Sequence, residues 1–151
     1  MISLSDMLAP ERIIDFATSN KESVLKELVF SIGTSPEIKD RKEFYREIVE
    51  REKVMSTGIG IGLAVPHVKI DSVSNFVMAI GRKPGGIEYD SIDGKLVDLV
   101  IMIGANSSQK SEYLKVLSKV VLLFKNQSFR KQIMNEKKPE KILELIKEQE
   151  N

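Results

Sequence analysis

The chain has 151 residues, of which 42% are hydrophobic and 30% charged, and its formal net charge is +1 at pH 7. This size and composition predict one globular domain over residues 1–151, and the small net charge argues against a nucleic-acid-binding protein and against electrostatic docking to a membrane. The chain has no cysteine, which excludes disulfides and thiolate sites and fits a cytoplasmic location. Neither a signal peptide nor membrane insertion is expected, because the apolar runs are far shorter than the roughly twenty residues that span a bilayer.

The first half of the chain is expected to alternate short strands with helices. Apolar periodicity and turn residues predict, in chain order, a strand over 12–16, helices over 21–32 and 41–53, and a short strand over 63–67. Ser19 or Asn20 is the expected N-cap of the first helix, and Gly33 its end. The strand over 63–67 is expected to stop at Pro66.

The second half is expected to form the central strands and three more helices. The pattern predicts strands over 76–82, 87–89 and 96–105, separated by turns at KPGG and DSIDGK. A helix after NSSQKSE is expected to bury Leu114, Leu117, Val120, Val121 and Phe124, and two shorter helices are expected near 128–135 and from Pro139. The fold class that follows is α/β, with a mixed sheet flanked by helices.

Three glycines alternate in the run MSTGIGIG, just before the only histidine of the chain. The run fits neither a dinucleotide fingerprint nor a phosphate P-loop, because the glycine spacing is wrong and no Gly-Lys-Ser/Thr follows. Two interpretations stay open. The glycines are needed for positive φ or close backbone approach, or the N–H groups of Gly58 and Gly60 form an anion cradle beside His67.

His67 is the main candidate for a chemical role. One histidine and no cysteine exclude a histidine-rich metal site, and no G-x-S-x-G elbow accompanies a hydrolytic serine. An imidazole can act as an acid, a base or a nucleophile near neutral pH, although a lone histidine often has no role. A guanidinium at Arg51 and hydroxyls at Ser56 and Thr57 would suit a phosphoryl-transfer site, with no metal or organic cofactor.

The segment REKVMSTGIGIGLAVPH, residues 51–67, resembles the active-site segment of enzyme IIA domains of the bacterial sugar phosphotransferase system, fructose/mannitol type. Later in the chain, DSIDGKLVDLV is similar to that family's D-x-x-D-G-x-x-V-D-L-V phrase. The N-terminal phrases LSDMLAPERI and SNKESVLKEL are closer to the stand-alone nitrogen-regulatory branch. The resemblance covers nearly the whole chain and implies the mannitol IIA-like (type 2) fold.

The resemblance also implies a phosphotransferase role. His67 would accept a phosphoryl group, through Nε2, from a histidine-phosphorylated carrier protein of the HPr kind. The group would then pass to a IIB domain, or its presence would regulate a partner. Arg51 would neutralise the phosphoryl charge, and the group that holds the other ring nitrogen of His67 is not identified. A regulatory binding module of the same fold, with weak or no phosphotransfer, is the alternative.

The chain departs from the family pattern at two positions. Val68 follows the histidine where a small residue is usual, and it is expected to narrow access to the ring. Tyr113 stands where many members have a second histidine, so two roles are open for it: core packing and a hydrogen bond to a phosphoryl oxygen. Ile59, Ile61 and Val68 are the expected apolar rim for partners. Glu52 is expected to be a surface charge, and the aspartates at 90, 93 and 98 to form turns.

Overall fold

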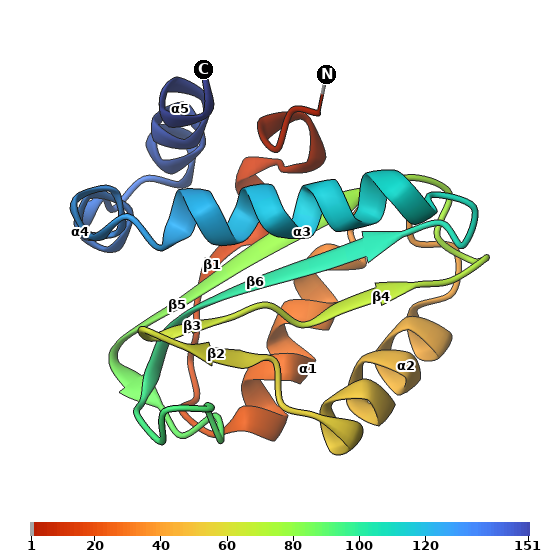
Figure 1. Ribbon diagram of the computed structural model, residues 1–151, viewed down its shortest axis with the longest axis horizontal. Coiled ribbons are helices and arrows are strands. Elements are labelled where there is room, and N and C mark those ends of the chain that lie inside the picture. The colour runs from red at the N-terminus through yellow and green to blue at the C-terminus, as the bar shows by residue number, and fades with distance from the viewer. Residues whose placement is uncertain (1) are drawn as a thin grey trace.

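A six-stranded mixed sheet lies between two layers of helices in the computed structural model, which describes residues 2–151 (Figure 1). The strands follow the order β1-β5-β6-β3-β2, and β4 pairs with β6 beyond the end of β3. Antiparallel pairs join β5 to β6 and β2 to β3, whereas β1 is parallel to β5 and both β3 and β4 are parallel to β6. The strands are β1 (Ile13–Asp15), β2 (Gly58–Gly60), β3 (Leu63–Ala64), β4 (His67–Lys69), β5 (Val77–Ile87) and β6 (Val97–Ala105).

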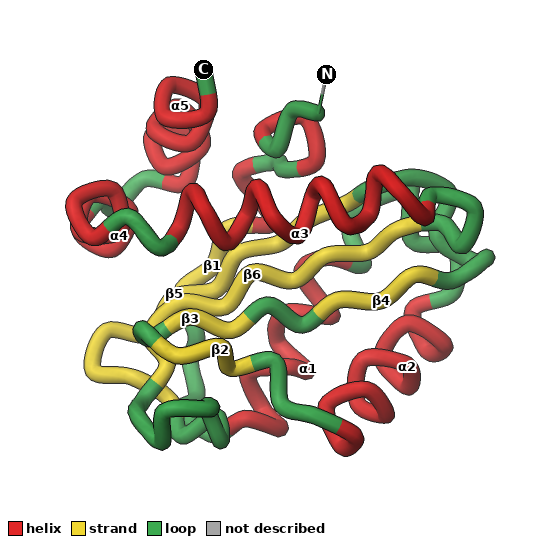
Figure 2. Tube along the Cα trace, in the orientation of Figure 1, coloured by secondary structure: helices red, strands yellow, loops and turns green. Residues whose placement is uncertain are grey.

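The helices divide between the two faces of the sheet (Figures 1 and 2). One face carries α1 (Lys21–Ile32) and α2 (Arg41–Val54). The other carries α3 (Lys110–Phe124), α4 (Gln127–Asn135), α5 (Pro139–Glu150) and the short 3-10 turns η1 (Ser5–Met7) and η2 (Pro10–Arg12). The predicted mixed α/β class and the predicted helices are confirmed, and Asn20 is the N-cap of α1. Within residues 2–151, no helix is long and apolar enough to cross a bilayer.

The central strand β6 explains why the sequence 97–105 is almost continuously apolar. Val100 and Met102 belong to the core on the α1–α2 side, whereas Leu99 and Ile101 belong to the core on the α3–α5 side. Successive side chains of a strand point to opposite faces, so a strand covered on both faces needs apolar residues at nearly every position. The buried strand predicted over 96–105 is therefore confirmed.

The segment 63–67 is not one strand but two short strands on either side of a break. Leu63 of β3 pairs with Leu99 of β6, and His67 of β4 pairs with Ile103, so both strands keep one register along β6. Pro66 interrupts the ladder because it has no N–H to donate. His67 therefore begins a strand rather than ending one.

The KPGG segment does not reverse the chain, because the strand predicted over 76–82 continues through it to Ile87 as β5. Of the strand predicted over 87–89, only Ile87 lies in a strand. Arg82 pairs with Leu99 and Ile87 with Val97, so residues 83–86 of β5 bulge out opposite the single residue Asp98 of β6. Gly85 and Gly86 have φ of +92° and +91° within this bulge. Two successive glycines in the positive-φ region let the chain loop out and return to the same partner strand.

The buried face of α3 agrees with the predicted one at Val120 and Phe124 but not at Leu114. Leu114 is 66% exposed, whereas Tyr113, Val116, Val120 and Phe124 are buried. These four positions follow spacings of three and four, which also define a helical face. The leucine-rich sequence of α3 fits both faces, and only the position of the sheet selects between them.

Two charged side chains hold segments at the edge of the fold. Glu150 joins the end of α5 to the first turn of the chain, and Arg82 of β5 joins the end of α4 to the sheet. The Glu150 carboxylate accepts hydrogen bonds from the N–H groups of Leu4 (2.8 Å) and Ser5 (2.9 Å), so the end of α5 caps the first turn of the chain. The buried Arg82 donates from Nη1 to the carbonyl of Ile133 at 2.6 Å, which holds the end of α4. Both contacts satisfy backbone groups at helix termini that lack intrahelical partners.

Candidate functional site

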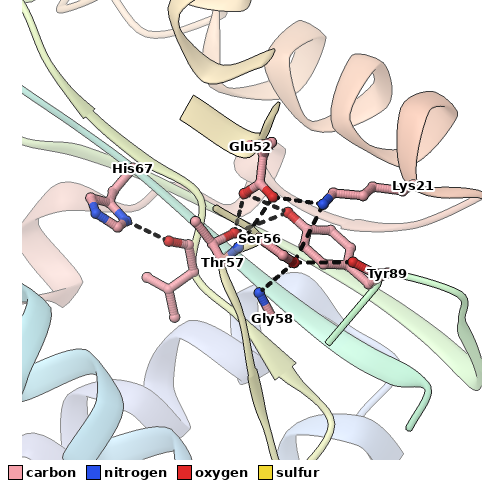
Figure 3. Close-up of polar contacts among 8 residues, drawn as sticks. Lys21, Glu52, Ser56, Thr57, Gly58, His67 and Tyr89 are labelled. Atoms are coloured by element: carbon pink, nitrogen blue, oxygen red, sulfur yellow. Dashed lines mark hydrogen bonds and ion pairs between the residues drawn. The ribbon is translucent and has the colours of Figure 1, made fainter. Parts of the chain in front are cut away.

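The imidazole of His67 is fixed by a backbone carbonyl two residues away. His67 is half-buried at the start of β4, and its Nδ1 lies 2.6 Å from the carbonyl oxygen of Val65 (Figure 3). A carbonyl oxygen only accepts hydrogen bonds, so Nδ1 carries the proton and Nε2 of the neutral ring keeps its lone pair. Val65 is therefore the acceptor that the sequence does not identify.

A groove of about 730 Å³ brings His67 and Arg51 together. Arg51 lies in the last turn of α2, and its side chain lines the same groove as the imidazole, across the surface from Leu117 and Val121 of α3. The arginine is exposed, so its guanidinium is available to an anion that enters the groove. His67 and Arg51, which the sequence analysis expects to act together, thus line one groove.

Tyr113 lies against His67, at 5.8 Å between the ring centroids. The side chain is only 7% exposed, and its hydroxyl is buried without a hydrogen-bond partner among the described residues. Burial raises the pKa of the Tyr113 hydroxyl to about 12, although the positive charge of Arg51 acts in the opposite direction. The hydroxyl therefore stays protonated near neutral pH, and it is a donor that no described group satisfies.

Ser56 and Thr57 line the groove, but their hydroxyls belong to another hydrogen-bond network (Figure 3). The Thr57 hydroxyl bonds to the Glu52 carboxylate and lies 3.1 Å from the Tyr89 hydroxyl. The Ser56 hydroxyl donates to the carbonyl of Tyr89 at 3.2 Å and accepts from the ammonium of Lys21 at 3.3 Å. The protons of both hydroxyls are therefore donated within the chain in this arrangement.

Glu52 is buried at the centre of that network, so the prediction of a surface charge is wrong. Its side chain is 5% exposed and forms an ion pair with Lys21 at 2.8 Å. Burial, together with the negative charge of Glu52, raises the pKa of the Tyr89 hydroxyl well above its usual value. The sequence held a signal for this position, since Phe44, Ile48 and Glu52 follow one another at i, i+4 and i+8 on the buried face of α2.

The backbone of the glycine run needs glycine at two positions, and the two N–H groups predicted to form an anion cradle bond within the chain. Gly60 and Gly62 have φ of +92° and +77°, which favours glycine. The N–H of Gly58 donates to Ser56 Oγ at 3.2 Å, and that of Gly60 to Ser91 Oγ at 3.0 Å. Because these donors are occupied within the chain, the first interpretation of the run is supported and the cradle is not.

The rim of the groove is apolar but differs from the predicted one. Val54 and Met55, at the end of α2, are exposed together with Ile59 and line the groove. Ile61 is exposed as predicted, but it does not line the groove. Val68 is fully buried in the core on the α1–α2 side, because the residue after His67 in a strand points to the opposite face. Val68 therefore neither narrows access to the ring nor faces partners.

The three aspartates lie in turns or have structural partners. Asp93 accepts from the N–H groups of Lys95 (3.0 Å) and Ile61 (3.2 Å), and the first of these bonds is the main reason for its lowered pKa. Asp90 has a positive φ of 60°, which fits a turn. Asp98 instead forms an ion pair with Arg130 of α4 at 2.5 Å. Among residues 2–151, no group of three or more histidines, cysteines or acids is placed to hold a metal ion.

Comparison with known proteins gives the same family from sequence and from structure. A family model described as "Phosphoenolpyruvate-dependent sugar phosphotransferase system, EIIA 2" matches residues 7–149. The "PTS system fructose-specific EIIABC component" of Bacillus subtilis is 32% identical over 146 residues, which cover 96% of this chain. The chain spans only 23% of the length of that relative.

Solved structures share the fold over nearly the whole chain. The nitrogen regulatory protein IIA-Ntr from Neisseria meningitidis superposes with a TM-score of 0.87 at 26% identity, covering 95% of this chain and 98% of that one. The mannitol enzyme IIA of Escherichia coli was solved in complex with phosphorylated mannitol enzyme IIB. It superposes with a TM-score of 0.78 at 20% identity, and the match covers 92% of this chain and 96% of that one. At this identity the similarity supports the fold alone. This chain belongs to the EIIA type 2 family of the phosphoenolpyruvate-dependent sugar phosphotransferase system.

Proposed function

We propose that this chain is a phosphohistidine relay protein, with His67 as the residue that takes up the phosphoryl group. The observation that carries the proposal is the hydrogen bond of 2.6 Å between His67 Nδ1 and the Val65 carbonyl. That bond selects the tautomer in which Nε2 is the nucleophilic nitrogen. The groove that His67 shares with the exposed Arg51 gives a phosphoryl donor room to approach.

The transfer exchanges one nitrogen–phosphorus bond for another. The bond in the donor's phosphohistidine breaks as a bond to Nε2 of His67 forms, and the donor imidazole leaves with the electron pair. Such a step needs positioning and neutralisation of charge more than covalent help. Arg51 supplies positive charge to the phosphoryl oxygens, and the Val65 carbonyl stabilises the ring as it becomes positive.

Tyr113 is the second proposed ligand of the phosphoryl group. Its hydroxyl is buried beside His67 and lacks a partner among the residues described, so a phosphoryl oxygen would satisfy a donor that is otherwise unpaired. A small rotation of the side chain is required, because the hydroxyl is not open to solvent in this structure. We do not include Ser56, Thr57, Gly58 or Gly60 as phosphate ligands, because their polar groups are already hydrogen-bonded.

The proposed donor is a histidine-phosphorylated carrier protein of the HPr kind, and the proposed acceptor is a IIB domain or a regulated partner. The fructose-specific relative, whose name includes the B component, supports the first acceptor. The similarity to IIA-Ntr, at 26% identity and nearly full coverage of both chains, supports the second. A binding module with weak or no phosphotransfer is the second candidate, favoured by tyrosine at position 113, which cannot carry a positive charge.

The test is phosphorylation by a defined donor, measured by intact mass. The purified protein is incubated with phosphoenolpyruvate, the general phosphotransferase enzyme and the carrier protein. One acid-labile phosphoryl group on the native protein and none on His67→Ala would support the relay, and Arg51→Ala should slow uptake severely while keeping the fold. Equally fast uptake by folded His67→Ala would refute the site. No uptake by the native protein, beside an acceptor known to work, would favour the binding module.

A further inference from the structure

Glu52 is a buried carboxylate with no place in the proposed transfer, yet its contact with Thr57 leads towards His67. It lies one position after Arg51 on α2, with its side chain directed away from the groove and into the protein. Its Oε2 accepts the N–H of Thr57 at 3.1 Å and lies 2.8 Å from the ammonium of Lys21. Its Oε1 accepts from the hydroxyls of Thr57 and Tyr89. A buried carboxylate with this many donors fixes the position of the groups around it.

A chain of three hydrogen bonds runs from Glu52 to the imidazole, and Figure 3 draws the first and the last of them. Glu52 holds the N–H and the hydroxyl of Thr57. The carbonyl of Thr57 accepts the N–H of Val65 at 3.0 Å, and the carbonyl of Val65 accepts from His67 Nδ1 at 2.6 Å. Val65 lies in the break between β3 and β4, where the sheet ladder is interrupted by Pro66. Its position therefore depends on Thr57 more than that of a residue within a regular strand would.

The same carboxylate also fixes the direction of Arg51. α2 ends at Val54, only two residues after Glu52, and helix termini fray when nothing holds them. The ion pair with Lys21 joins this last turn of α2 to the first turn of α1. Adjacent helical positions point in different directions, so anchoring Glu52 in the interior turns Arg51 towards the groove.

We propose that Glu52 is the positioning residue of this site. Through Thr57 and Val65 it holds His67 with Nδ1 protonated and Nε2 free, and through the last turn of α2 it presents Arg51. The inference rests on the proposed phosphoryl transfer for its consequence, although the orientation of His67 can be measured without any donor. Glu52 touches neither the ring nor the incoming group, so its effect is on geometry.

The test combines the nitrogen spectrum of His67 with the rate of phosphoryl transfer. The chain has one histidine, so a long-range ¹H–¹⁵N spectrum contains a single imidazole. In the native protein Nδ1 should give a protonated signal and Nε2 an unprotonated one. In Glu52→Ala both signals should move towards the average of two exchanging tautomers. The maximal rate should fall about tenfold or more, with the KM for the carrier protein unchanged within about twofold, because a misplaced group lowers the rate more than binding.

Glu52→Gln is the conservative variant and Glu43→Ala the matched control. The glutamine can still accept from Thr57, so it should keep the native spectrum and most of the rate. Glu43 lies in the first turn of the same helix, bonded to Ser72 and outside the groove, so its loss should change neither readout. If Glu52→Ala does not fold, Thr57→Val tests the same chain and should move the two nitrogen signals in the same direction.

Native nitrogen signals and a native rate in a folded Glu52→Ala protein would overturn the inference. Equal changes in the nitrogen signals and the rate in Glu43→Ala would also overturn it, since the effect would then come from a general loss of stability of α2. Failure of the proposed function has a different signature. The native protein would take up no phosphoryl group, while the spectra of the variants would still decide whether Glu52 orients His67.

Discussion

Tyr89 and Tyr113 are both buried, but their hydroxyl groups have opposite surroundings. The Tyr89 hydroxyl donates to Glu52 Oε1 at 3.1 Å and lies 3.1 Å from the Thr57 hydroxyl. The Tyr113 hydroxyl is buried with no partner among the residues that the structure describes. Replacing either tyrosine with phenylalanine removes one oxygen atom and leaves the ring. The same chemical change should therefore have effects of opposite sign on the free energy of unfolding.

The expected changes in the free energy of unfolding follow from the hydrogen bonds that each hydroxyl makes or lacks in the folded protein. A hydrogen bond to a charged group contributes about 1.5 to 3 kcal/mol, so Tyr89→Phe should lower the free energy of unfolding by about 2 kcal/mol. A buried polar group without a partner costs about 1 to 3 kcal/mol, so Tyr113→Phe should raise it by about 1 kcal/mol, at the lower end of that range. In a chain of this size, 1 kcal/mol corresponds to a change of about 2 to 4 °C in Tm.

Urea unfolding of the unphosphorylated protein, followed by circular dichroism, measures both values, and the slope with urea should stay constant. In Tyr113→Phe, stability and retention of the phosphoryl group should change in opposite directions. The more stable variant should hold its phosphoryl group less well, with faster transfer or hydrolysis of the phosphohistidine. A Tyr113→Phe protein that is less stable than the native one would refute the reasoning, because the hydroxyl would then have a partner in the folded protein.

Three further changes test the contacts that hold the fold. Burial raises the pKa of Glu150, but hydrogen bonds from the N–H groups of Ser5 and Leu4 and from the side chains of Ser5 and Lys119 together lower it below its usual value. The stability that this carboxylate contributes is therefore present above its unfolded pKa and lost as pH falls through the folded value. In Glu150→Gln, urea midpoints measured between pH 7 and 3 should fall less steeply. Arg82→Met leaves two carbonyls at the end of α4 without their donor and should cost about 2 to 4 kcal/mol in urea unfolding. Gly81→Ala places a Cβ 2.0 Å from the Phe16 ring and should cost at least about 2 kcal/mol, visible as a lower Tm.

The sequence predicts the helices and strands of this fold well where the spacing of apolar residues fits only a helix or only a strand. α1, α2 and β6 agree with their predicted bounds to within one residue, because each carries an apolar pattern that fits only one kind of element. The pattern fails at 83–86, where two glycines in succession are typical of a turn and form a bulge here. Local sequence encodes the positive φ of both residues, but the partner strand decides whether the chain turns back or continues.

In the candidate site, too, some features could be predicted from the sequence and others could not. His67 and Arg51 are identified by their type and by the motif around them, and the structure places both in one groove. The directions of side chains are harder to predict. Val68 would face the groove in a loop but faces the core in β4, because pairing with β6 sets the alternation of the strand. Chemistry can thus be assigned from residue types, whereas orientation requires the sheet.

Glu52 and Tyr113 show why polar residues on an apolar face are informative. Each continues the buried face of its helix, Glu52 after Phe44 and Ile48, and Tyr113 before Val116 and Val120. A polar group on such a face costs free energy unless it finds partners. Glu52 finds four donors within the chain, so its position is explained by the folded state alone. The Tyr113 hydroxyl finds none among residues 2–151. In the function that we propose, Glu52 positions the site, whereas the Tyr113 hydroxyl would donate to the phosphoryl group that arrives from outside the chain.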